Sequence, residues 1–316
     1  HISFHPNAGG TRTAHLGAYV GDDTGAATED HASLKLVGRG DADAVAANHF
    51  FGDLQAARHG LDALMYTVTD SADANGQLCA LVFTAKDSSG LTVRQTWRVR
   101  PDSYLIDLAV DLDGVPAAWR VSDYSLTVRS WPQVTEANLQ LDQRSLRAIS
   151  LVGKDVHRDM AMSRVGKEPK VDNGVARWAG VQSHYFLGLV ATTSNDGRGA
   201  MREAVADTLA DAELARRPKG TKAIEPVAVG TLVMPVGVNG SASHHFVAYF
   251  GPADFFTLAK QGHAFELERA VDLGWNWITP VSRLLLQGLR VIAGVVHNYG
   301  LTILLLAFLI RLALHP

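Results

Sequence analysis

Short runs in which apolar and polar residues alternate dominate the chain from residue 61 onward. In Thr92–Val99, the odd positions are mostly apolar and the even positions carry threonine or arginine. A period of two is typical of a β-strand with one buried face, and turn residues such as Asp73-Ala74-Asn75-Gly76 separate neighbouring runs. The pattern therefore predicts a mainly β, antiparallel sandwich. The expected strands are Leu61–Thr69, Leu78–Lys86, Leu91–Arg100, Tyr104–Leu112, Trp119–Val128, Val175–Val181, Tyr185–Thr192, Val227–Pro235 and His245–Phe250.

Three segments lack this strand pattern. Residues 1–30 are rich in glycine, alanine, threonine and aspartate, which indicates irregular structure or short strands at a sheet edge. Lys154–Gly174 is polar and charged, so we expect a long loop between sheets. Met201–Arg217 has helix-forming composition with mostly alanine as its apolar residue, which predicts an exposed helix or a surface insertion.

The pattern becomes helical after Gly251. Asp254 precedes Phe255–Lys260 as an expected N-cap, because a short acidic side chain can accept a hydrogen bond from the first helical turn. Pro280–Val296 is amphipathic, with a wide apolar side. Its narrower polar side contains Ser282, Arg283, Gln287 and Arg290.

Trp275 and Trp277 stand just before this amphipathic helix. Tryptophan is favoured at the depth of lipid headgroups, so the combination predicts a helix that lies along a membrane surface, with Arg283 and Arg290 on its polar rim. The alternative is an ordinary helix of the soluble domain that buries its apolar side, with two core tryptophans.

Leu301–Ile310 is almost wholly apolar, and Asn298-Tyr299-Gly300 is expected to turn the chain into it. A membrane-spanning helix needs about 20 mostly apolar residues, and counting from Tyr299 leaves barely that room before the sequence ends. We therefore expect a transmembrane helix in a fragment of a longer protein.

Arg311 interrupts this apolar run, and a charge inside such a helix is costly. Two interpretations are open from the residues alone. Arg311 can reach a lipid headgroup near the helix end, or it can serve a functional site within the membrane.

Composition narrows the classes of function. The 316 residues carry a formal net charge of -3, which provides no basic surface for nucleic acid. The single cysteine cannot form an internal disulfide, so the apolar core must hold the fold.

Histidine and carboxylate patterns indicate neither a metal site nor a catalytic site. His184, His244 and His245 lack metal-ligand spacing, and adjacent residues of a strand such as His244 and His245 point to opposite faces. No nucleophile elbow or phosphate-binding glycine loop is evident. We expect no enzymatic activity, no metal and no cofactor.

The C-terminal residues resemble the YidC family of membrane protein insertases. The family pattern is an aspartate, a Gly-Trp pair, an amphipathic helix, a turn, and an apolar helix with one arginine and a later proline. Weaker likeness to the periplasmic domain of Gram-negative members lies upstream. The matching residues are Asp272, Gly274-Trp275, Pro280–Val296, Asn298-Tyr299-Gly300, Leu301–Ile310, Arg311 and Pro316, and upstream Trp178, Tyr185-Phe186, Leu81-Val82-Phe83-Thr84 and Thr92-Val93.

The resemblance implies a periplasmic β-supersandwich similar to galactose mutarotases at residues 1–265. It implies a connector and interfacial helix at 266–298, and a transmembrane helix at 299–316. Arg311 would line a hydrophilic groove that receives nascent membrane proteins. The implied location is the bacterial inner membrane, with residues 1 to about 280 in the periplasm. Membrane lipid and Sec translocon subunits are further implied partners.

A second hypothesis belongs to another class. A mutarotase-like sandwich tethered by one C-terminal anchor would bind or epimerise a carbohydrate in a cleft lined by histidine and glutamate. A fold of this type does not by itself confer sugar chemistry, so the site must decide.

Overall fold

The computed structural model describes residues 2–4, 11–16, 34–37, 53–54, 59–61, 64–72, 78–100, 103–130, 144–208, 224–274, 279–313 and 315. All of its paired strands are antiparallel, and its longer helices follow residue 254. The chain divides into two compact units, His1–Ala270 and Val271–Pro316. The first unit is the β-rich part, and the second contains two helices.

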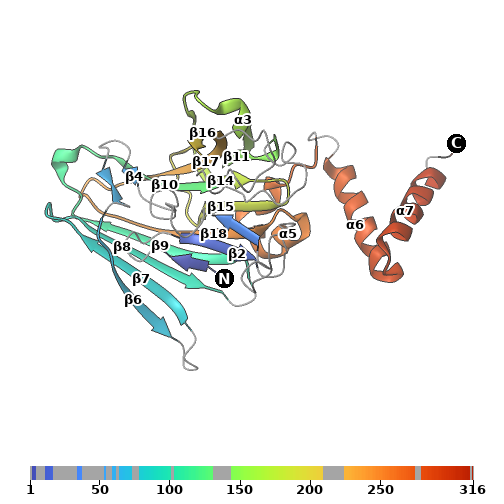
Figure 1. The fold of residues 1–316 in the computed structure, drawn as a ribbon, viewed down its shortest axis with the longest axis horizontal. Helices are drawn as coiled ribbons and strands as arrows, with labels where there is room; N and C mark the ends of the chain where they lie inside the picture. Colours follow the sequence, from blue (N-terminus) through green and yellow to red (C-terminus); the bar gives the residue numbers. More distant parts are fainter. Residues whose placement is uncertain are drawn as a thin grey trace. The chain divides into compact units, whose positions relative to one another are not determined.

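A nine-stranded sheet forms the larger layer of the first unit. Its strand order is β12-β11-β14-β15-β18-β9-β8-β7-β6, and Figure 1 shows β7, β8 and β9 side by side. Along the chain its strands are β6 (Thr67–Ala72), β7 (Leu78–Lys86), β8 (Thr92–Val99), β9 (Leu105–Asp113), β11 (Arg147–Val152), β12 (Asp155–Met160), β14 (Ala176–Gln182), β15 (Phe186–Thr192) and β18 (Ala242–Pro252).

A six-stranded sheet in the order β13-β16-β17-β10-β4-β5 packs against the first, with β14 touching β17 and β11 touching β16. A three-stranded sheet contains the N-terminal strands. The remaining strands are β1 (Ile2–Phe4), β2 (Thr11–Leu16), β3 (Leu34–Val37), β4 (Asp53–Leu54), β5 (His59–Gly60), β10 (Asp123–Ser130), β13 (Lys170–Asn173), β16 (Gly199–Thr208) and β17 (Ile224–Pro235).

The main core lies between the two large sheets. Its side chains come from alternate positions of each strand, as the period of two requires. On β8, Val93, Gln95 and Trp97 are buried, whereas Arg94 is exposed. The two sheets approach closely at Gly230, where a Cβ would collide with the backbone of Gly180 on the facing sheet.

Part of the outer face of the nine-stranded sheet is also buried, around β11. Ile149 is completely buried although its neighbour Ala148 belongs to the core between the sheets, so Ile149 points the other way. Arg158 is paired with Ile149 across β11 and β12, and it donates to the carbonyl oxygen of Arg269 at 2.8 Å. The segment that contains α5 (Phe255–Gly262) and the 3-10 turns His263–Phe265 and Leu267–Ala270 therefore packs on this face.

The predicted antiparallel sandwich is confirmed, and most expected strands are present with ends shifted by a few residues. Two predicted strands begin further from their expected first residue than the others do. The strand expected from Leu61 begins at Thr67, because the buried Tyr66 hydroxyl donates to Leu61 O in a turn. The strand expected from Trp119 begins at Asp123, after the 3-10 helix Ala117–Trp119.

The long loop expected at Lys154–Gly174 was wrong. This segment contains β12, β13 and the short helix α3 (Ala161–Arg164). Its charged residues form ion pairs with one another and with a neighbouring strand, so charge did not indicate a solvated loop.

The exposed helix or surface insertion expected at Met201–Arg217 was also wrong over its described part. Residues 201–208 belong to β16, which pairs with β13 on one side and β17 on the other. Alanine favours helix in isolation, but the ladder hydrogen bonds and the burial of Arg202 and Ala204 outweigh that preference. Residues 209–217 lie outside the described residues.

Candidate functional site

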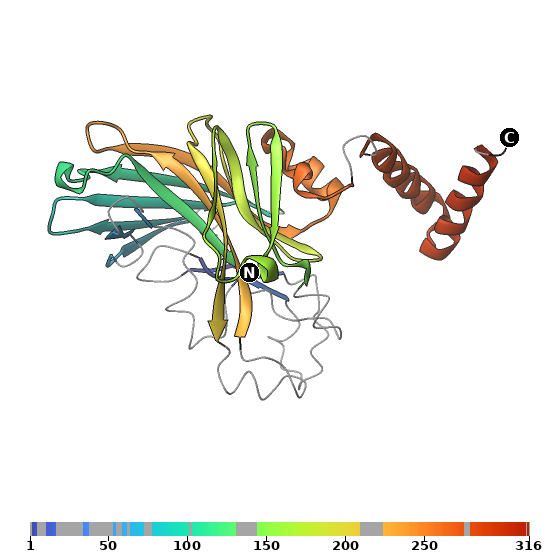
Figure 2. The same cartoon turned by 90° about the horizontal axis from the view of Figure 1, so that it is seen from above.

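A helical hairpin makes up most of the second unit. Helix α6 (Thr279–Val296) and helix α7 (Tyr299–Ala313) are joined by a tight turn, and both helices are plain in Figure 2. His297 has a φ of 55°, and its N–H donates to Ala293 O at 2.9 Å. This left-handed residue ends α6 in the manner of a helix C-cap.

Asn298 begins the second helix. Its Oδ1 accepts a hydrogen bond from Leu301 N at 3.2 Å, and its carbonyl oxygen accepts one from the Thr302 hydroxyl at 2.8 Å. The reversal expected at Asn298, Tyr299 and Gly300 is thus made by His297 and Asn298. Tyr299 and Gly300 already form the first turn of α7.

The two helices contact each other through small residues and through side chains that are half-buried. A Cβ on Gly288 of α6 would lie 3.6 Å from Leu306 Cδ1 of α7, which is ordinary van der Waals contact. Thr302 is fully buried, whereas Leu306 and Ile310 are half-buried on the same side of α7. Positions i, i+4 and i+8 therefore form the seam of the hairpin.

Most large apolar side chains of the hairpin face away from this seam. Leu304 is 68% exposed and Phe308 is 62% exposed. By length and composition, α6 is the one helix among the described residues that could cross a membrane, and α7 is a shorter apolar helix. So large an apolar surface marks contact with a membrane or with another protein.

The predicted site residues that the structure describes all lie on this hairpin. Arg283 and Arg290 are exposed on α6, and Arg311 is exposed in the last turn of α7. Trp275 and Trp277, expected to lie at headgroup depth, fall outside the described residues.

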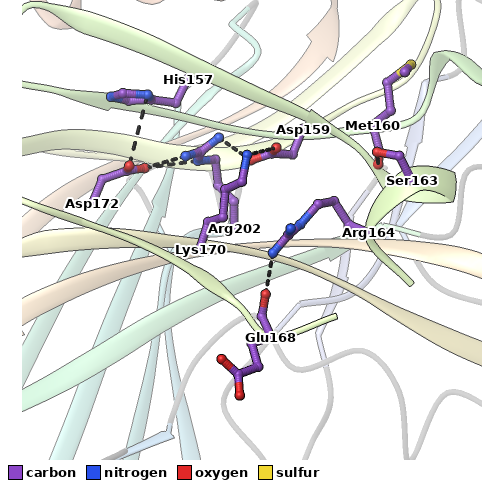
Figure 3. Close-up of polar contacts among 9 residues, drawn as sticks. All are labelled: His157, Asp159, Met160, Ser163, Arg164, Glu168, Lys170, Asp172 and Arg202. Carbon is purple, nitrogen blue, oxygen red and sulfur yellow. Dashed lines mark hydrogen bonds and ion pairs between the residues drawn. The ribbon is translucent and has the colours of Figure 1, made fainter. Parts of the chain in front are cut away.

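A cluster of charged residues, which sequence reasoning missed, lies at one edge of the sandwich (Figure 3). Arg202 of β16 is only 3% exposed and forms ion pairs with Asp159 of β12 and Asp172 of β13. Lys170 Nζ donates to Asp159 Oδ1 at 2.7 Å, and His157 Nδ1 lies 4.0 Å from Asp172 Oδ1. The cluster therefore joins the edge strands of both large sheets.

Charge balance explains how this cluster is tolerated in the interior. Burial alone would raise the pKa of the Asp159 carboxyl, but the hydrogen bond from Lys170 and the positive charges of Arg202, Lys170 and Arg164 together lower it. The carboxylates of Asp159 and Asp172 face two cations, and the Arg202 guanidinium forms an ion pair with each carboxylate. The arrangement is that of a structural clamp.

A cleft of about 490 Å³ lies at another place in the sandwich. His244 of β18 reaches across to the six-stranded sheet, where its Nδ1 is 2.9 Å from the hydroxyl of buried Tyr124. Burial lowers the pKa of His244, against the opposing charge of Asp196, so its imidazole is neutral at neutral pH. The cleft is lined by Asp196, Arg198, Pro235, Val236, Gly237, Val238, Ser241, Ala242, Ser243 and His244.

The histidines behave as the strand pattern predicts. His244 is buried and its neighbour His245 is exposed, so they point to opposite faces. Within the part of the chain that the structure describes, no group of three or more histidine, cysteine, aspartate or glutamate residues could hold a metal ion.

Two of the solved structures with a similar shape are described as a galactose mutarotase-like protein and an aldose epimerase homologue. A galactose mutarotase-like protein from Lactobacillus casei covers 79% of this chain and 96% of its own, with a TM-score of 0.46 and 10% identity. A GalM/aldose epimerase homologue from C. elegans covers 79% and 95%, with a TM-score of 0.43 and 9% identity.

The two sequence relatives described next have the same name. A protein of Geobacter metallireducens called membrane protein insertase YidC is 28% identical over 269 residues, which are 83% of this chain and 45% of the relative. The insertase YidC of Chlorobium phaeovibrioides is 28% identical over 225 residues, 70% of this chain and 36% of the relative. The chain thus spans less than half the length of these relatives.

The family comparison covers most of the sandwich and the start of α6. Residues 25–281 match the family described as the YidC periplasmic domain. The match and the named relatives agree with the resemblance that Asp272–Pro316 suggested. This chain belongs to the YidC periplasmic domain family.

Proposed function

We propose that this chain is the periplasmic domain and the first membrane-associated helices of a membrane protein insertase. In this proposal the sandwich lies in the periplasm up to about residue 280, and the hairpin lies at the bacterial inner membrane. The observation that carries it is the combination of a YidC periplasmic domain with a hairpin whose large apolar side chains are exposed.

The two helices suit different positions in the membrane. Helix α6 carries Arg283, Gln287 and Arg290 on one side. An arginine at the bilayer centre costs roughly 2.5–3.5 kcal/mol on insertion scales, so α6 is more stable along the surface than across the bilayer. Helix α7 is apolar on all sides up to Arg311, so it is the helix that begins to cross.

Arg311 is the residue that we assign to the substrate. Its exposed charge would hold water inside the membrane, which lowers the cost of moving a hydrophilic segment past it. In surroundings of low dielectric constant it would also attract carboxylates of the incoming chain strongly. Nascent membrane proteins are the substrates, and transfer of their apolar segments into lipid drives the process.

The test is insertion of a substrate whose translocated segment is acidic, using the full-length protein in proteoliposomes. Arg311→Ala should slow insertion by about tenfold or more, since losing one close charge pair in a site of intermediate dielectric costs more than ~1.4 kcal/mol. Arg311→Lys keeps the charge and should retain most activity. The exposed Arg94→Ala on the sandwich is the matched control.

Unchanged insertion by Arg311→Ala, with normal protein level, would contradict this role of Arg311. A substrate without charges in its translocated segment should depend less on Arg311. This second substrate separates a groove role from a general loss of folding.

A second candidate function, carbohydrate binding, is supported by the cleft at His244. Asp196, Arg198 and His244 together offer acceptors and donors for vicinal hydroxyl groups. Among the described residues that line this cleft there is no glutamate, unlike the cleft expected from the sequence. Calorimetric titration with simple aldoses and with peptidoglycan fragments tests it. Saturable heat that is absent in Asp196→Ala would support binding.

Sec translocon subunits are the protein partners that we propose for the sandwich. Cross-linking from exposed sandwich residues in intact membranes is the direct test. The proposal involves no cofactor and no nucleic acid.

A further inference from the structure

Helix α6 has three distinct faces. With 100° between successive residues, Arg283, Gln287 and Arg290 fall within about 60° of one another, at positions i, i+4 and i+7. Beside this arginine stripe runs an apolar stripe that is exposed in the described structure. Its members are Leu284, Val291 and Val295, which are between 68% and 76% exposed.

The third face of α6 packs on α7. Gly288 faces Leu306, and Leu289, Ile292 and Val296 are half-buried. The hairpin thus fixes the rotation of α6 about its axis. If the apolar stripe enters the acyl chains, the arginine stripe is held beside it, at the level of the phosphates.

Basic residues outnumber acidic residues in this second unit. The sequence contains no Asp or Glu after Asp272, whereas Arg283, Arg290 and Arg311 all follow it. A guanidinium binds phosphate with two parallel hydrogen bonds, and its long apolar stem can lie along the lipid surface.

We propose that Arg283 and Arg290 bind the headgroups of anionic phospholipids and give the hairpin a preference for them over zwitterionic lipids. This inference rests on the proposed position of α6 along the membrane. It goes beyond that position because an apolar stripe alone would not distinguish lipids by charge. About 10 Å separates the two arginines along the helix axis, so each can contact a different headgroup.

Native mass spectrometry of the full-length protein in detergent tests the preference. Phosphatidylglycerol and phosphatidylethanolamine of identical chain length are titrated separately, and the dissociation constant of each is measured. A basic residue near an anionic surface changes affinity by about fivefold, so the double variant Arg283→Gln/Arg290→Gln should lose about 25-fold for phosphatidylglycerol. Its affinity for phosphatidylethanolamine should be unchanged.

Two further variants define the comparison. Arg94→Gln/Arg98→Gln removes the same charge from exposed positions of β8 and should keep the wild-type preference. Arg283→Lys/Arg290→Lys keeps the charge without the planar guanidinium, so it should restore most of the preference.

Each outcome distinguishes the two proposals. An undiminished preference in the double glutamine variant overturns the role of the arginine stripe but leaves α6 on the membrane. Equal binding of both lipids by the wild-type protein also overturns the role of the arginine stripe and leaves α6 on the membrane. The membrane position of α6 is overturned as well by two results together. The wild-type protein would retain neither lipid, and limited proteolysis would cleave the hairpin equally with and without lipid.

Discussion

The sandwich and the hairpin differ in which side chains they bury and which they expose. In the sandwich, Trp97 and Leu108 are almost wholly buried, and Arg202 is buried only with two carboxylates around it. In the hairpin, Leu304 and Phe308 are more than 60% exposed, and Arg311 follows a run of ten residues in which only Thr302 is polar.

Under the proposed function, this difference is explained by the different solvents that the two units meet. A sheet in water must bury its apolar face, and its core then excludes charge unless the charge is paired. In the membrane position that we propose, a helix hairpin gains nothing by burying leucine, so close packing at Gly288 and Thr302 decides the contacts between α6 and α7 instead.

The largest expected effect concerns the buried clamp. Arg202→Ala leaves Asp159 and Asp172 without their shared partner and should lower the free energy of unfolding of the sandwich by about 3–5 kcal/mol. Urea denaturation followed by circular dichroism measures it. The matched control is Arg100→Ala, which breaks the exposed pair with Asp107 and should cost about 1 kcal/mol or less. Equal losses would show that burial does not distinguish the pairs.

A pair of identical substitutions sharpens the comparison of solvents. Leu108→Ala, in the core between the sheets, should cost about 2–5 kcal/mol of sandwich stability. Leu304→Ala, on the exposed side of α7, should change it by about 0.5 kcal/mol at most. The second variant should instead weaken partitioning of the protein into vesicles. A similar loss of sandwich stability in both variants would contradict the division into two units.

Removing a helix cap should have a smaller effect on stability than these substitutions, and the effect should be similar in both units. Asp254 Oδ2 accepts from Thr257 N at 2.8 Å at the start of α5, as predicted, and Asn298 serves α7 in the same way. Alanine at either position should cost about 1 kcal/mol. Denaturation reports Asp254→Ala, and amide hydrogen exchange at Leu301 reports Asn298→Ala. Unaltered exchange at Leu301 would mean that its N–H has another acceptor.

The smallest effect is a dependence of sandwich stability on pH. The lowered pKa of His244 means that the unfolded chain binds the proton more readily. The stabilising contribution is complete above the ordinary pKa of 6.5 and is lost as pH falls through the lower folded pKa. The urea midpoint of the wild-type protein should fall between pH 7.5 and 5.5, and that of His244→Gln should fall less. Asp159, whose folded pKa is lowered, adds a separate loss below about pH 4.

Strand positions could be predicted well where one face of a strand is buried and the other is not. The alternation in β8 placed Val93 and Trp97 inside and Arg94 outside, and Leu78–Lys86 is a strand over its predicted length. Gln95 shares the inner face although it is polar, and its side-chain amide donates to the Tyr66 hydroxyl. Local periodicity was sufficient because it reflects burial directly.

The errors arose where a partner far along the chain decides the structure. Residues 201–208 form a strand because β13 and β17 flank them, and the charged residues of β12 and β13 are ordered by Arg202. The position of the cleft at His244 was missed for the same reason, since the hydroxyl of Tyr124 contacts His244 from the other sheet. Single-sequence patterns contain no signal for such pairings.

By itself, the sequence determined the antiparallel β class, the amphipathic helix at Pro280–Val296 and the apolar run before Arg311, because periodicity and composition follow the solvent that each face meets. The tertiary structure alone decided the clamp around Arg202, the cleft at His244 and which apolar side of α6 packs on α7. These features depend on contacts between distant residues, and their free energy exists only when the elements pack together.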